Sequence, residues 1–218
     1  MDRADLAKFI DYSLLKADAT EKQVRELCLS AKKLRTNSVC ITPRYVRHAK
    51  KILGNSGVRV ACVVGYPLGA NLTETKVFEA QKAIRDGADE LDVVMNIGEF
   101  KSKKHGFVLK ELKEIVTAAK KIKKNVKVKI IIEAGLLTND EVKKASVLVL
   151  KSGADFVKTG TGWSKGASVE VVKLIKSVVR NKIGIKAAGG IRTRKQAETL
   201  IKAGATRIGT SSAEEILK

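Results

Sequence analysis

The sequence contains few cysteine, proline and aromatic residues, and each scarcity narrows what the chain can be. Its 218 residues include three cysteines, two prolines and 4% aromatic residues. Cys28, Cys40 and Cys62 show neither paired spacing nor a nearby histidine cluster, so neither a disulfide framework nor a metal site is indicated. No Gly/Ser-rich run suggests a linker, and we expect one domain over residues 1–218.

Targeting features are also lacking. The start, Met-Asp-Arg-Ala-Asp, does not have the basic and then apolar layout of a signal peptide, and no apolar run approaches the length that spans a bilayer. Free thiols suit a reducing compartment. We therefore expect a soluble, cytoplasmic protein without a membrane partner.

Positive charge, by contrast, is abundant. Lysine and arginine number 43 against 23 acidic residues, which gives a formal net charge of +20. Such a charge could bind nucleic acid, bind an anionic small molecule or only solvate the surface. Eleven lysines lie within 101–129, where apolar residues keep a helical period: Val108, Leu112, Ile115, Val116, Ala119 and Ile122. Because aromatic residues are few and do not interleave with the lysines as a base-stacking platform would require, we expect a solvated helix and no nucleic-acid partner. The lysine-rich composition also fits a thermophilic source.

Short β-like runs alternate with longer helical patterns along the chain. We predict eight strands, over 9–13, 38–42, 60–65, 90–96, 128–133, 155–159, 183–188 and 206–210. Helices are predicted over 20–34, 45–53, 73–86, 106–123, 139–152, 168–180, 193–203 and 211–217. Several end at a glycine that can adopt left-handed backbone, at Gly87, Gly153 and Gly204. Eight β/α units favour closure, so the predicted fold is a (β/α)8 TIM barrel with a short helix before strand one.

Charged residues stand inside three predicted strands, in a fold that binds substrates at the C-terminal ends of its strands. Asp92 lies in strand four, Lys158 ends strand six and Lys186 lies in strand seven. A lone lysine could reach solvent, and Asp92 could belong to a structural ion pair. Two lysines on neighbouring strands favour a catalytic role instead, because the repulsion between their ammonium groups favours the loss of a proton from one of them. The neutral amine can then form a Schiff base with an aldehyde, with Asp92 shuttling protons.

Glycine-rich segments follow the last three predicted strands. They are Thr161-Gly162, Gly189-Gly190-Ile191-Arg192 and Gly209-Thr210-Ser211-Ser212. Backbone N–H groups in these loops, with the N-terminus of the final predicted helix, would form a phosphate cradle where such barrels often have one.

Six ordered motifs, spread over nearly the whole chain, resemble the deoxyribose-phosphate aldolase family of class I (Schiff-base) aldolases. They are Ser38-Val-Cys-Ile-Thr-Pro43, Val63-Val-Gly-Tyr-Pro-Leu-Gly-Ala-Asn71, Asp89-Glu-Leu-Asp-Val-Val-Met-Asn-Ile-Gly98, Phe156-Val-Lys-Thr-Gly-Thr-Gly162, Lys186-Ala-Ala-Gly-Gly-Ile-Arg192 and Arg207-Ile-Gly-Thr-Ser-Ser212. The resemblance implies that Lys158 is the Schiff-base lysine, Lys186 the lysine that tunes it and Asp92 the proton-transfer carboxylate, with no metal or other cofactor.

The same resemblance implies a substrate-binding set and a reaction. The set is Asp11, Cys40, Thr159, Thr161, Gly162, Gly189, Gly190, Arg192, Gly209, Ser211 and Ser212. For Cys40, a small buried hydrophobic role is an alternative. The implied reaction is the reversible cleavage of 2-deoxy-D-ribose 5-phosphate into D-glyceraldehyde 3-phosphate and acetaldehyde. A homo-oligomer, dimer or tetramer, is implied as well.

The chain also departs from the family pattern. Tyr12 and Ser13 stand where histidine and threonine are frequent, Gly160 where serine is frequent, and Trp163 where some relatives carry a lysine. Certain bacterial relatives end in a tyrosine that helps proton transfer, which this sequence lacks, so solvent or Asp92 would have to suffice. Alternatives are a transaldolase-like or fructose-bisphosphate aldolase-like barrel, a non-catalytic phosphate-binding barrel and a basic nucleic-acid-binding protein.

Overall fold

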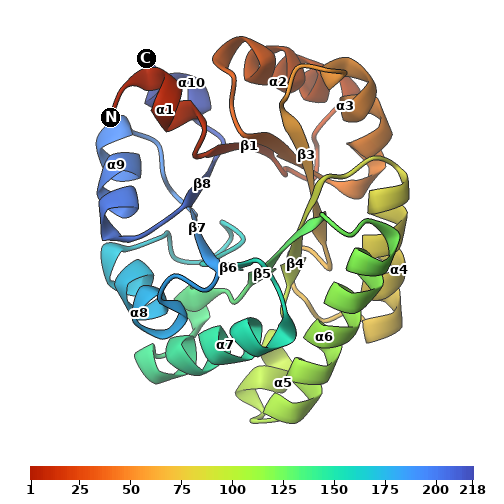
Figure 1. Cartoon of the computed structure of the whole chain (residues 1–218), viewed down its shortest axis with the longest axis vertical. Helices are drawn as coiled ribbons and strands as arrows, with labels where there is room; N and C mark the ends of the chain where they lie inside the picture. The colour runs from red at the N-terminus through yellow and green to blue at the C-terminus, as the bar shows by residue number, and fades with distance from the viewer.

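Eight parallel strands close into a barrel in chain order in the computed structural model of residues 1–218 (Figure 1). The strands are β1 (Ile10–Leu14), β2 (Ser38–Ile41), β3 (Arg59–Val64), β4 (Glu90–Val94), β5 (Lys127–Ile131), β6 (Phe156–Lys158), β7 (Gly184–Ala188) and β8 (Arg207–Thr210). The predicted (β/α)8 TIM barrel is confirmed, and every predicted strand overlaps an observed one.

Helices surround the barrel (Figure 1). They are α1 (Arg3–Ala7), α2 (Glu21–Leu34), α3 (Val46–Leu53), α4 (Thr73–Arg85), α5 (Ile97–Lys101), α6 (His105–Ile122), α7 (Asn139–Ser152), α8 (Val169–Val179), α9 (Arg194–Ala203) and α10 (Ala213–Ile216), with 3-10 turns η1 (Pro43–Tyr45) and η2 (Ala134–Leu136). The expected helix before strand one is α1. The sequence did not predict α5, because five residues are too few to show a helical period.

Helix starts and ends follow local side-chain chemistry. Thr20, Thr138 and Thr193 each cap a helix, and each exchanges hydrogen bonds with a Gln or Glu three residues later. The predicted glycine endings are confirmed, since Gly153 is the left-handed C-cap of α7 and Gly87 has a φ of 112°.

The main apolar core lies between the strands and the surrounding helices. Cys28 is buried in this core on α2, and all three cysteines are free. Ile122, which the sequence pattern placed on the buried stripe of α6, is instead exposed, because it is the last residue of that helix. No helix has both the length and the apolar character needed to cross a bilayer.

The interior of the barrel is charged rather than aliphatic. Branched aliphatic side chains fill most barrels of this kind. Here the buried charged residues of the strands are Asp11, Glu90, Asp92, Lys129, Lys158, Lys186 and Arg207. Because an unpaired buried charge is very costly, these groups must neutralise one another.

Candidate active site

The three residues predicted to act together meet at one carboxylate oxygen. Lys158 Nζ and Lys186 Nζ each donate to Asp92 Oδ2 over 2.7 Å. The Lys158 side chain is 3% exposed, and the other two are fully buried. The strand register produces this arrangement, since Lys158 on β6 lies directly beside Lys186 on β7.

Lys129 is a third lysine on the same carboxylate, and the sequence analysis missed it. Its Nζ lies 2.8 Å from Asp92 Oδ1 and 2.6 Å from Glu90 Oε2. Lys129 pairs with Asp92 across β4 and β5. The available signal is a lysine between Val128 and Ile130 in a predicted strand. Lys129 also ends the lysine-rich segment 101–129, which hides this signal in the sequence.

Asp11 lies beneath these lysines rather than on a substrate-facing wall. Its carboxylate is 2.5 Å from Lys186 Nζ and 2.7 Å from Arg207 Nη1. Arg207 also donates to Glu90 over 2.9 Å. Asp11 therefore orients Lys186 from below, and Glu90 and Arg207, which the sequence analysis also missed, complete the charged floor of the barrel.

The charges of this cluster do not balance when every group is ionised. Three carboxylates, Asp11, Glu90 and Asp92, face four buried cations, Lys129, Lys158, Lys186 and Arg207. The half-exposed Arg59 adds a contact to Glu90 over 3.4 Å. Lys158 contacts one carboxylate, whereas Lys186 contacts two and Lys129 lies within 4 Å of three. Lys158 is therefore the buried lysine with the fewest carboxylate partners.

The neighbouring groups are held in their charged forms. Burial works against the ammonium of Lys186, but Asp11 and Asp92 outweigh it and raise the pKa of Lys186 above its ordinary value. Burial likewise opposes the charge of Asp92, yet Lys129, Lys158 and Lys186 lower the pKa of Asp92 well below its ordinary value. The arrangement therefore places the Lys158 amine beside two groups that are held in their charged forms.

Two further predicted residues lie within the barrel wall. Cys40 is fully buried, its Sγ lies 3.7 Å from Asp92 Oδ2, and burial raises the pKa of its thiol. Thr159 Oγ1 donates to the carbonyl of Ala188 over 3.1 Å and accepts from the N–H of Ala188 over 3.0 Å. Thr159 thus ties the ends of β6 and β7 together and does not line the pocket.

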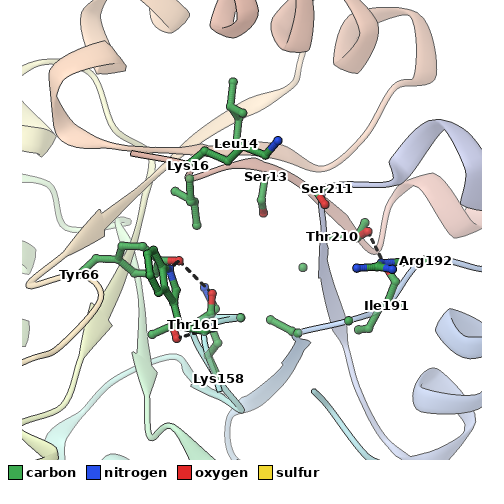
Figure 2. A pocket seen from close by; sticks show the side chains of 17 residues that line it. Ser13, Leu14, Lys16, Tyr66, Lys158, Thr161, Ile191, Arg192, Thr210 and Ser211 are labelled. Carbon is green, nitrogen blue, oxygen red and sulfur yellow. Dashed lines mark hydrogen bonds between the residues drawn. The ribbon is translucent and has the colours of Figure 1, made fainter. Parts of the chain in front are cut away.

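A pocket of about 320 Å³ opens above Lys158 at the C-terminal ends of the strands (Figure 2). The predicted residues on its wall are Lys158, Thr161, Gly162, Gly189, Gly190, Arg192, Gly209 and Ser211. Ser212 is not on the wall, and its N–H donates to Thr210 Oγ1. Asp92 and Lys186 lie below the pocket, so Lys158 is the cluster member that reaches it.

The pocket wall carries positive charge and no carboxylate. Lys16, Lys158 and Arg192 are its charged residues, and Lys16 was not predicted from the sequence. The backbone N–H groups of Gly162, Gly190 and Ser211 donate to no group of the chain. The final helix, α10, begins at Ala213, two residues after its predicted start, and has four residues. Loop N–H groups and two side-chain cations are the kinds of group that can hold an anion.

Tyr66 and Arg192 lie on opposite sides of the pocket (Figure 2). The Tyr66 hydroxyl donates to the carbonyl of Thr161 over 3.1 Å and accepts from Trp163 Nε1 over 2.9 Å. Burial raises the pKa of Tyr66 to about 12, so its hydroxyl stays protonated at neutral pH. Trp163 thus adds an uncharged side chain to the pocket wall, hydrogen-bonded to Tyr66.

Comparisons with known proteins give a consistent result. The model of the DeoC/LacD family aldolase matches residues 6–217. A deoxyribose-phosphate aldolase of Aciduliprofundum boonei is 50% identical over 219 residues, covering 100% of this chain and 98% of that protein. One of Thermococcus gammatolerans is 48% identical and covers 98% of this chain and 96% of that protein. The solved tetrameric deoxyribose phosphate aldolase from Aeropyrum pernix is 36% identical with a TM-score of 0.92, over 99% of this chain and 91% of that one.

Proposed function

The chain belongs to the DeoC/LacD aldolase family, and from this premise we propose that it reversibly cleaves 2-deoxy-D-ribose 5-phosphate to D-glyceraldehyde 3-phosphate and acetaldehyde through a Schiff base on Lys158. The observation that carries the proposal is the position of Lys158. It is the one lysine of the buried cluster that reaches the pocket, and it has the fewest carboxylate partners.

The cleavage begins with addition of the neutral Lys158 amine to the C1 aldehyde of the open-chain sugar. Loss of water leaves a protonated imine, which can accept an electron pair. A base removes the proton of the C3 hydroxyl, the bond between C2 and C3 breaks, and its electrons form an enamine on Lys158. C3 becomes the aldehyde of glyceraldehyde 3-phosphate, which leaves.

The second half of the reaction returns the enzyme to its starting state. The enamine takes up a proton at C2, and water hydrolyses the resulting imine to acetaldehyde and free Lys158. Asp92 and the ammonium of Lys186 are the proton-transfer groups in this proposal, because both lie within hydrogen-bond distance of one another beside Lys158 Nζ.

The pocket wall supports a phosphorylated substrate. Lys16 and Arg192 form no ion pair within the chain, and no carboxylate lines the pocket to repel an anion. Free N–H groups from three loops add neutral donors. A phosphate held on this side would place the C1 end of a five-carbon sugar toward Lys158.

Substrate comparison tests the proposal. We expect cleavage of 2-deoxyribose 5-phosphate to exceed cleavage of fructose phosphates by orders of magnitude, with loss of activity in Lys158→Leu. Preference for a ketose phosphate would instead favour a transaldolase-like or fructose-bisphosphate aldolase-like enzyme. Phosphate binding without turnover of any of these sugars would favour a non-catalytic barrel.

We also propose that the chain forms a homo-oligomer. The Aeropyrum pernix relative is described as tetrameric. Leu68, Leu72 and Phe78, on α4 and the loop before it, are each more than half exposed, which is costly for a monomer. Light scattering coupled to size-exclusion chromatography measures the mass directly.

A further inference from the structure

Glu133 is a buried carboxylate without a cation. It follows β5 and is 5% exposed. No lysine or arginine forms a salt bridge with it, in contrast to the carboxylates inside the barrel. A buried charge of this kind persists only where hydrogen-bond donors replace water.

Its donors all come from the loop between β6 and α8, which forms part of the pocket wall. The Thr161 N–H donates to Glu133 Oε2 over 3.1 Å, and the Thr161 hydroxyl donates to the same oxygen. The Ser164 hydroxyl donates to Oε1 over 2.5 Å. Thr161 Oγ1 in turn accepts from the N–H of Trp163 over 3.1 Å. One carboxylate thereby fixes three residues of the loop and leaves the Gly162 N–H between them free.

Glycines allow this close approach on both sides. A Cβ at Gly160 would lie 2.8 Å from Glu133 Oε1, and a Cβ at Gly135 would lie 2.6 Å from Ser164 Oγ. Both distances are shorter than a Cβ atom tolerates without displacement of its neighbour. The absence of a side chain at Gly160 thus leaves room for the Glu133 carboxylate.

We propose that Glu133 is a positioning residue that holds the β6–α8 loop so that the Gly162 N–H faces the phosphate group of the substrate. The identity of that anion rests on the proposed function, whereas the hydrogen bonds between Glu133 and the loop do not. Glutamine has nearly the same shape, but it has no negative charge, and its single carbonyl oxygen replaces two acceptors, so a hydroxyl that faces its NH2 can no longer donate to it.

Glu133→Gln tests the proposal, with Glu170→Gln on the surface of α8 as the matched control. Calorimetric titration with inorganic phosphate should show an affinity about tenfold weaker in Glu133→Gln, the usual effect of losing hydrogen bonds to a charged group. The KM for 2-deoxyribose 5-phosphate should rise about as much with kcat nearly unchanged, since the loop binds the anion rather than the reacting atoms. Unphosphorylated 2-deoxyribose should be cleaved as by the wild type.

The loop contains the single tryptophan of the chain, Trp163, which reports its order without reference to activity. We expect lower fluorescence anisotropy in Glu133→Gln than in Glu170→Gln. Ser164→Ala keeps the carboxylate and removes one donor, so it should change phosphate affinity and anisotropy in the same direction by less. This second variant keeps the test informative if Glu133→Gln does not fold.

Unchanged phosphate affinity and unchanged anisotropy in Glu133→Gln and Ser164→Ala would overturn the positioning role. Equal losses on phosphorylated and unphosphorylated sugar would overturn it as well, because they would indicate general damage. If the wild type binds phosphate in a Glu133-dependent way but does not cleave 2-deoxyribose 5-phosphate, the proposed function fails and the positioning role stands.

Discussion

Lys129 belongs to the charged cluster around Lys158 without reaching the pocket. Its ammonium lies against Glu90 and Asp92, and although burial works against its charge, these two carboxylates raise its pKa above the ordinary value. Lys129 thus holds Glu90 and Asp92 together beneath Lys158.

Lys129→Met should therefore leave Glu90 and Asp92 buried with one ammonium partner fewer. Because removing one partner of a buried ion pair leaves an uncompensated charge, the free energy of unfolding should fall by about 3–5 kcal/mol. Denaturant unfolding at pH 7 measures this loss. Unchanged stability would contradict the role of Lys129 as the shared cation of these two carboxylates.

Lys16 is the second residue with a testable individual role, because it lines the pocket and has no carboxylate partner. Lys16→Gln should raise the KM for 2-deoxyribose 5-phosphate about tenfold, as expected for a lost charge-assisted contact. Cleavage of unphosphorylated 2-deoxyribose should not change. Lys22→Gln, on exposed α2, is the control, and equal effects of the two substitutions would exclude a specific contact for Lys16.

At the scale of elements, the strands were predictable because each is a short apolar run bounded by turn residues. Lys158 and Lys186 were predictable for the same reason, since a lysine within such a run is conspicuous. Lys16 was not, because it stands in a loop after a strand, where charge is ordinary. Glu133 was not, because it is the last residue of the predicted strand 128–133 and its partners lie in the loop after another strand. Only the closure of the barrel and the path of the loops bring Lys16 to the pocket and Glu133 against the loop that lines it.

The contact between α4 and α6 contains a buried ion pair remote from the pocket. Lys76 on α4 donates to Glu111 on α6 over 3.0 Å and to the carbonyl of Val94, at the end of β4, over 3.1 Å. Both side chains are almost fully buried. The pair therefore links two neighbouring helices to one strand end.

Replacing one partner of this ion pair should lower the free energy of unfolding more than replacing both partners. Lys76→Met leaves Glu111 buried and unpaired and should lower the free energy of unfolding by about 3–5 kcal/mol. Lys76→Met combined with Glu111→Leu should recover at least about 2 kcal/mol of that loss. Denaturant unfolding of the single and double variants measures the coupling, and additive losses would contradict a buried pair.

At the scale of the whole molecule, the net charge is +20, but the charged barrel interior depends on carboxylates for its stability. Burial opposes the ionisation of Asp11, but Lys186, Arg207 and Lys129 outweigh it and hold the pKa of Asp11 below its ordinary value. A lowered pKa means that the ionised carboxylate stabilises the fold above the unfolded-state pKa of about 3.9 and that this contribution is lost as the pH falls below it.

Asp11→Asn should consequently destabilise the protein in a pH-dependent way. The loss in unfolding free energy should be about 3–5 kcal/mol at pH 7, because Arg207 and Lys186 are left with too little negative charge. The difference from the wild type should shrink below about pH 4, where Asp11 becomes protonated in the unfolded wild-type chain. A difference that stays constant from pH 7 to pH 3 would contradict the assigned ionisation.

The central claim is that Lys158, rather than any other lysine of this lysine-rich chain, carries the substrate. Incubation with acetaldehyde and borohydride would reduce the imine to a stable N-ethyl lysine, which peptide mass spectrometry can map. We predict the N-ethyl group on Lys158 at far higher occupancy than on Lys129, Lys186 or the surface lysines. Trapping concentrated on Lys186, or spread evenly over surface lysines with Lys158 unmodified, would contradict the account.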